Sequence, residues 1–156
     1  MKKFVALLAA AALTAALAAC SSGGNEAPEY ELSLVDELAS CGAFSEELEP
    51  LDADVLWSLY RLESAGLTRE QLTDAAALRS AGATCEEAAV LLMADESAAQ
   101  AAAQALEDYV DNQIQSNENY RPQEIPKLEN ALVDQRGSSV LLLVANDRDA
   151  AQALLS

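Results

Sequence analysis

The chain contains no histidine, and this absence excludes several common catalytic and metal sites. Ser-His-Asp and Cys-His catalysis need an imidazole as the general base, and histidine-ligated metal sites need it as a ligand. The sequence also has no GxGxxG segment, no P-loop and no CxxC pair, the short signatures of nucleotide and redox sites. Catalysis by a pair of carboxylates stays open, since two acids can share the general acid and base roles.

Basic residues are scarce as well. Nine lysines and arginines stand against 26 acids, so the formal net charge is −17, and loss of Lys2 and Lys3 in a cleaved leader would take it to −19. Nucleic acid and anionic lipid headgroups are bound through lysine and arginine, so we expect no nucleic-acid partner. Cationic partners remain compatible with this charge, which otherwise serves solubility.

Aromatic residues and cysteines are few, and each of them carries a specific expectation. Trp57 and Tyr60 are expected in the core rather than on a ligand platform. Cys41 and Cys85 either form a disulfide or remain two separate, partly buried thiols, and the second alternative is favoured. A reactive thiol is disfavoured because no histidine is present to act as its base.

The N-terminus has the pattern of a bacterial secretion signal. Lys2 and Lys3 precede an uncharged run over residues 4–19, which is shorter than the roughly 20 residues of a membrane-spanning helix. The segment Leu17-Ala18-Ala19-Cys20 resembles the lipobox of bacterial lipoproteins. That resemblance implies a signal peptide over residues 1–19, its removal, and a diacylglyceryl group on the sulfur of Cys20.

Two acyl chains hold a protein stably on a membrane, so lipidated Cys20 suffices as an anchor without a transmembrane helix. Residues 20–33 show no apolar periodicity and are expected to form a flexible tether. We therefore expect an extracytoplasmic, lipid-anchored, monomeric protein whose single domain covers residues 34–156.

The domain is predicted to be α+β, with a small antiparallel sheet of about four strands in two hairpins and helices covering one face. Apolar spacing predicts a first helix that ends at Gly42 and a second that begins near Asp52 or Asp54. A long helix is expected after a cap at Ser97, paired with Gln100. The remaining expected elements are strands at 88–94, 131–135 and 139–145, a turn around Pro122–Pro126, and a final helix after Asn146 or Asp147.

Residues 68–82 give conflicting signals. Thr68 to Gln71 is a possible capping box, and the alanines that follow favour a helix. Residues 74–80 can instead form a strand that ends at the Ala81-Gly82 turn. The residues alone leave both alternatives open.

Three segments carry a family resemblance: Leu51–Tyr60, AGATCEEAAVLLMADESAAQAA and NYRPQEIPKLENALVDQRGSSVLLLVAND. Together they resemble the bacterial lipoprotein family catalogued as domain of unknown function 4358, over roughly residues 45–155. The resemblance implies a strand at residues 74–80 and no known activity or catalytic residue. Its markers are Glu87, Tyr120 with Pro122, Lys127-Leu128-Glu129-Asn130-Ala131 and Gly137, whereas Ser139 departs from a commonly aromatic position.

Two surface clusters are candidate sites. Tyr120, Arg121 and Lys127 could contact a peptide or an anion, but Tyr120 is expected to pack on the long helix and Lys127 to offset nearby glutamates. The acids between 46 and 54 could bind calcium, but they lack the order and the glycine of an EF-hand and fit a solvated helix approach better. The acids concerned are Glu46, Glu47, Glu49, Asp52 and Asp54.

These observations predict a membrane-anchored binding or interaction module that is not an enzyme and holds no cofactor or metal. Two alternatives remain open. One is a carboxylate-dependent enzyme of cell-envelope glycans, which needs two acids facing each other across a cleft. The other is a calcium-responsive adhesion or sensing domain.

Overall fold

The computed structural model describes residues 27–155, which form one five-stranded antiparallel sheet with helices, so the α+β class is confirmed. The strand order is β1-β2-β3-β5-β4, and every neighbouring pair is antiparallel. The sequence predicted about four strands, and the additional one is β1, which has two residues and is too short to show an alternation of apolar and polar side chains. The strands are β1 (Glu49–Pro50), β2 (Leu72–Arg79), β3 (Glu87–Met93), β4 (Leu132–Arg136) and β5 (Ser139–Val144).

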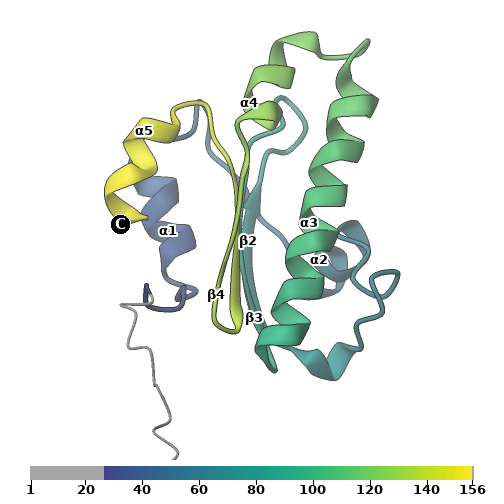
Figure 1. Ribbon diagram of the computed structural model, residues 1–156. Coiled ribbons are helices and arrows are strands. Elements are labelled where there is room, and N and C mark those ends of the chain that lie inside the picture. Colours follow the sequence, from purple (N-terminus) through teal and green to yellow (C-terminus); the bar gives the residue numbers. More distant parts are fainter. Residues whose placement is uncertain (1–26, 156) are drawn as a thin grey trace, which may run out of the picture.

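Helices lie on both faces of the sheet, not on one as expected (Figure 1). One layer holds α1 and α5, and the other holds α2 and α3. None of the helices within residues 27–155 is long and apolar enough to cross a membrane. The helices are α1 (Leu34–Ser40), α2 (Ala53–Leu59), α3 (Glu96–Asn117), α4 (Ile125–Glu129) and α5 (Arg148–Ala151), with short 3₁₀ turns at Arg69–Gln71, Pro122–Glu124 and Gln152–Leu154.

The two central strands explain why both faces are covered. β5 is buried at every position and β3 at all but one, so each strand is apolar on both sides. Successive residues of a strand point to opposite faces, and each face therefore needs its own cover. Leu91 and Leu142 belong to the core under α2 and α3, whereas Val90 and Leu141 belong to the core under α1 and α5.

The conflict at residues 68–82 is resolved in favour of the strand. The capping box between Thr68 and Gln71 is present, but it closes only a single 3₁₀ turn before β2 begins at Leu72. β2 then pairs with β3 along its length, with Leu78 opposite Ala88. Ladder pairing and burial override the helical preference of the alanines here.

The starts of three helices were predicted with mixed success. Asp52 caps α2 and Asp147 caps α5, as expected, each accepting a backbone hydrogen bond. The expected cap of α3 at Ser97 is wrong, because Asp95 accepts from the Ala98 N–H at 2.8 Å and the helix begins at Glu96. Aspartate caps a helix as well as serine does, and Asp95 follows directly on the end of β3.

Side chains of α2 and α3 pack on the sheet with one local exception. Small residues let α3 approach closely, and Leu56 and Trp57 of α2 are buried as expected. Val55, an apolar residue of α2, is 52% exposed. It lies about 100° around the helix from Leu56, outside the narrow face that this short helix buries.

The domain begins earlier than residue 34. The Tyr30 N–H donates to Ser139 Oγ at 2.7 Å, and the Ser138 N–H donates to Glu29 at 2.6 Å. Ser139 is fully buried and accepts this bond, so it helps to hold the start of the domain. Gly137, with φ 55°, forms the predicted β4–β5 turn beside it. The expected signal peptide, the expected lipidation site Cys20 and the first part of the expected tether lie outside the described residues.

Candidate functional site

Two adjacent acids at the start of β3 are among the most deeply buried side chains of the domain. Glu86 is 0% exposed and Glu87 is 2% exposed. Neighbouring residues of an extended chain point in opposite directions, and the two carboxylates accordingly have separate partners. A buried carboxylate is costly unless it is paired and hydrogen-bonded, so the partners of each acid reveal its role.

Glu87 lies at the centre of a buried network under α2 and α3. Its carboxylate accepts hydrogen bonds from the Tyr60 hydroxyl at 2.5 Å, the Tyr109 hydroxyl at 2.8 Å and Arg79 Nε at 3.2 Å. The two tyrosine rings meet edge to face, 5.0 Å apart between centroids. Burial raises the pKa of Glu87, and burial together with the Glu87 charge raises the pKa of both tyrosines, which keeps them protonated donors.

A groove of about 600 Å³, here called the α2–α3 groove, opens beside this network. Tyr60 and Tyr109 line it, so the ring pair links the groove to Glu87. Arg61, two residues after the end of α2, has a left-handed backbone with φ 53°, and within residues 27–155 its guanidinium has no ion-pair partner. Other polar residues that line the groove are Ser64, Asp108, Asp111, Asn112, Gln113, Gln115 and Ser116.

The groove offers charges of both signs and neutral hydrogen-bonding groups. Asp108 and Asp111 both belong to α3, so these two acids lie on one wall and do not face each other across the groove. Arg61 supplies a cation from the opposite wall, and amides and hydroxyls supply neutral hydrogen-bonding groups. The residues can therefore contact a small ligand that carries polar groups and charge of either sign.

Glu86 belongs to a second buried network, which ties α4 to the sheet. Lys127 Nζ lies 2.6 Å from Glu86 and 3.2 Å from Glu124. Glu86 also accepts from the Ser45 N–H at 2.8 Å, and Glu124 accepts from the Cys85 N–H at 2.9 Å. Burial alone would lower the pKa of Lys127, but the hydrogen bonds and charges of the two glutamates raise it. The expectation that Lys127 offsets nearby glutamates is confirmed.

Tyr120, Arg121 and Lys127 do not form one contact patch. Arg121 donates to the carbonyls of Gly82 and Thr84, and Lys127 is engaged by the two glutamates. The expectation that Tyr120 packs on the long helix is wrong, because its side chain is 88% exposed. α3 ends at Asn117, and the turn that follows directs Tyr120 to solvent.

The acids between 46 and 54 have separate structural partners. Glu46 accepts from Ser80 and Thr84, whose hydroxyls lower its pKa, while Asp52 caps α2 and Asp54 pairs with Arg69 at 2.6 Å. Across residues 27–155, no group of three or more histidine, cysteine, aspartate or glutamate side chains is placed to hold a metal ion. The residues that were candidates for calcium thus do not converge.

Cys41 and Cys85 are separate thiols, in agreement with the favoured alternative. Cys85 is buried in the core under α2 and α3, and Cys41 packs against the core on the other face of the sheet. Burial raises the pKa of Cys85, which disfavours the reactive thiolate.

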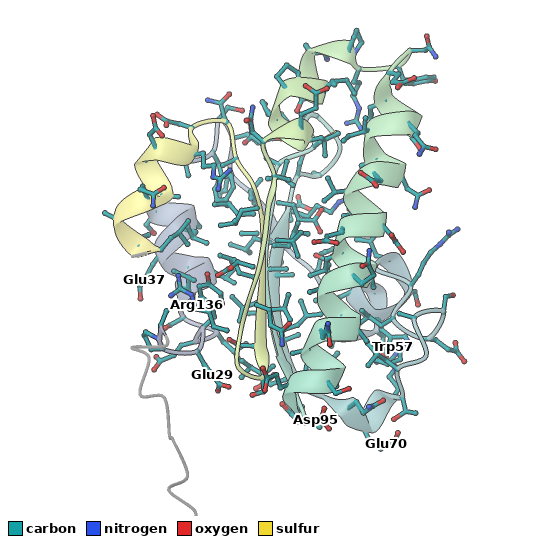
Figure 2. All side chains as sticks on the ribbon, viewed as in Figure 1. Glu29, Glu37, Trp57, Glu70, Asp95 and Arg136 are labelled. Carbon is teal, nitrogen blue, oxygen red and sulfur yellow. The ribbon has the colours of Figure 1, made fainter. Side chains whose placement is uncertain are left out.

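Trp57 is a core residue as expected, with the Arg69 guanidinium 4.8 Å from its ring centroid. Figure 2 shows Trp57 on the α2–α3 side and Arg136 on the α1–α5 side.

Sequence reasoning found part of this arrangement. Glu87 was noted as a family marker and Tyr60 as a core residue, but neither their contact nor the roles of Arg79 and Tyr109 were predicted. Glu86 was missed, although two acids directly before a buried apolar strand are an unusual pattern. Because acids are rarely buried without a partner, this pattern is the sequence signal that could have identified the pair.

One comparison with known proteins gives a match. The family model described as Domain of unknown function (DUF4358) matches residues 42–145, which include all five strands and helices α2 to α4. No curated protein and no solved structure matches the chain. The matched range covers more than half of the sequence and agrees with the resemblance expected from roughly residue 45 onward. The chain therefore belongs to the DUF4358 family.

Proposed function

We propose that this protein is a ligand-binding module held at the outer face of the bacterial cell membrane by lipid on Cys20. The leader and the lipobox support the anchor. The described chain starts beside the β4–β5 turn, where Glu29 bonds to Ser138, and the α3–α4 connection lies at the opposite end of the domain (Figure 1). An anchor before residue 27 would therefore leave the α3–α4 end and the upper part of the α2–α3 groove facing away from the membrane.

The α2–α3 groove is the observation that carries the binding role. It has polar groups on both walls, and the buried Tyr60–Glu87–Tyr109 network holds its floor in place. Glu87 supports binding rather than catalysis, because its two oxygens already accept hydrogen bonds from three donors. A rigid floor lowers the ordering cost of binding, which favours a preformed recognition site.

The anchor is tested by replacing Cys20 with serine in the full-length chain. We expect the wild-type protein in the membrane fraction, with an intact mass that starts at Cys20 and includes a diacylglyceryl group. Cys20→Ser should lack the lipid and keep the uncleaved leader, because the oxygen of serine cannot replace the thiol in lipid transfer. Cys41→Ser is the matched control and should remain lipidated. An unmodified Cys20 in the wild-type protein would refute the anchor.

The binding role is tested by nuclear magnetic resonance of the full-length protein with a panel of free amino acids, small sugars and polyols. A true ligand should shift amide signals on both walls of the groove, in Ser64 and Asn112 among others. Arg61→Gln should weaken binding of an anionic hit about tenfold or more, since it removes one charged contact. Hits that shift neither wall, or that bind Arg61→Gln equally well, would count against the groove.

A further inference from the structure

Strand β4 is an open edge of the sheet. It stands last in the strand order and pairs only with β5. Arg136 lies opposite Ser139 across the β4–β5 turn, and the N–H of Met93 in β3 donates to the Ser138 carbonyl. In this pattern Arg136 and every second residue before it direct their backbone groups toward β5. The backbone groups of Val133 and Gln135 consequently point outward, and within the described chain they have no partner. Figure 1 shows no helix in front of this edge.

Two separate hollows, called here the upper and the lower part of the β4–α3 hollow, lie beside this edge between β4 and α3. Its upper part has a volume of about 300 Å³, and the apolar side chains of Val110, Ile114, Leu128 and Val133 form part of its lining. Its lower part, of about 370 Å³, lies between Gln135 and the first turns of α3. The unpaired backbone and the hollow together are called the β4 edge below.

The charged residues that line the hollow are all acidic, whereas Arg136 of β4 forms an ion pair with Asp134. Glu107, Asp111 and Glu129 line the upper part, and Glu96 lines the lower part. All four acids are exposed, and within residues 27–155 none has an ion-pair partner. No lysine or arginine lines either part. Two copies of the chain paired edge to edge would bring two sets of these acids together, which disfavours self-association.

We propose that the β4 edge docks an extended, basic segment of a partner protein, which adds to the sheet as a further strand. Backbone hydrogen bonds to Val133 and Gln135 would provide the part of the affinity that does not depend on the partner's side chains, as in other cases of strand addition. Side chains on one face of the added strand would enter the hollow, where apolar groups meet the floor and basic groups meet the four acids. This inference rests on neither the α2–α3 groove nor the lipid anchor.

The first experiment uses the full-length protein in a neutral detergent and a fluorescent peptide of alternating lysine and valine. We expect this peptide to bind at least tenfold tighter than two controls, namely a glutamate–valine peptide and a lysine–valine peptide N-methylated at alternate residues. The second control keeps the charge but cannot complete the backbone ladder. Hydrogen exchange should slow at the amides of Val133 and Gln135 on binding. Equal binding of either control, or protection elsewhere, would overturn the proposal.

Variants separate the backbone contribution from the charge contribution. Val133→Pro removes an outward N–H without removing a ladder hydrogen bond, so the fold should persist while binding weakens about tenfold or more. The double change Glu107→Gln and Asp111→Asn should also weaken binding, most strongly at low salt. Asp36→Asn with Glu37→Gln removes two exposed charges from α1 and should leave binding unchanged. Equal losses in both charge variants, or a dimer abolished by Val133→Pro, would contradict a basic partner strand.

Discussion

Replacement of Lys127 by methionine is expected to lower the free energy of unfolding by about 3–5 kcal/mol. Lys127 is the cation that lies between Glu86 and Glu124, and its side chain is only 15% exposed. Methionine keeps much of the apolar stem but leaves both buried carboxylates without a positive partner. Removal of one member of a buried ion pair is costly because the remaining charge stays desolvated. Urea unfolding followed by circular dichroism measures the difference.

Arg69→Met is the matched control for Lys127→Met. Arg69 pairs with Asp54 at the surface, where the two side chains are 47% and 81% exposed. Exposed ion pairs contribute about 0–1 kcal/mol, so this variant should change stability far less. Adding Glu86→Gln to Lys127→Met should restore part of the loss, because it removes one of the uncompensated charges. Similar losses in the two single variants would show that burial of the Lys127 cluster is energetically unimportant.

Replacement of Glu87 by alanine should have an effect of similar size. The two tyrosine hydroxyls and Arg79 Nε would lose their common acceptor, and each buried unsatisfied group costs about 1–3 kcal/mol. Partial access of water to Arg79, which is 31% exposed, reduces the total, so we expect about 3–5 kcal/mol. Glu87→Gln retains one acceptor oxygen and should lose about half as much. Equal losses for alanine and glutamine would indicate that packing, not the acceptor, stabilises this site.

The same residue gives a prediction with a definite pH direction. The pKa of Glu87 is raised above its unfolded value of 4.5 because the site is buried. The native state therefore binds the Glu87 proton more tightly than the unfolded state does. The resulting contribution to the free energy of unfolding is fully present below pH 4.5 and is lost as the pH rises through the folded-state pKa. Glutamine does not titrate, so the free energy of unfolding of Glu87→Gln lacks this pH dependence. The difference in free energy of unfolding between the wild type and Glu87→Gln should therefore narrow as the pH rises.

Glu46→Gln provides a control of opposite sign. Hydrogen bonds from Ser80 and Thr84 lower the pKa of Glu46, so its contribution is present above pH 4.5 and is lost as the pH falls through the folded-state pKa. The gap between Glu46→Gln and the wild type should therefore narrow on acidification. Parallel pH profiles for the Glu46 and Glu87 variants would contradict the assigned shifts.

Local patterns were enough to predict much of the framework. The β4–β5 hairpin follows from Gly137 between two strand-like segments, of which β5 is apolar. The starts of α2 and α5 follow from Asp52 and Asp147, because hairpin turns and helix caps are decided within a few residues. The cap of α3 was misplaced by two residues, since Asp95 and Ser97 are both competent caps. The positions of the helices on both faces were not predicted, although fully apolar β3 and β5 required cover on each side.

The sequence by itself determined the negative charge, the lack of imidazole chemistry and the α+β class, because these depend on composition and on patterns within single elements. Tertiary structure decided which acids are buried and what holds them. Lys127 meets Glu86 across 41 positions of sequence, and Tyr60 meets Glu87 across 27. The tertiary structure also decided that β4 is the last strand of the sheet, with one edge open beside several acids. Such contacts depend on strand order and layer packing, which bring together residues whose local sequences carry no signal of each other.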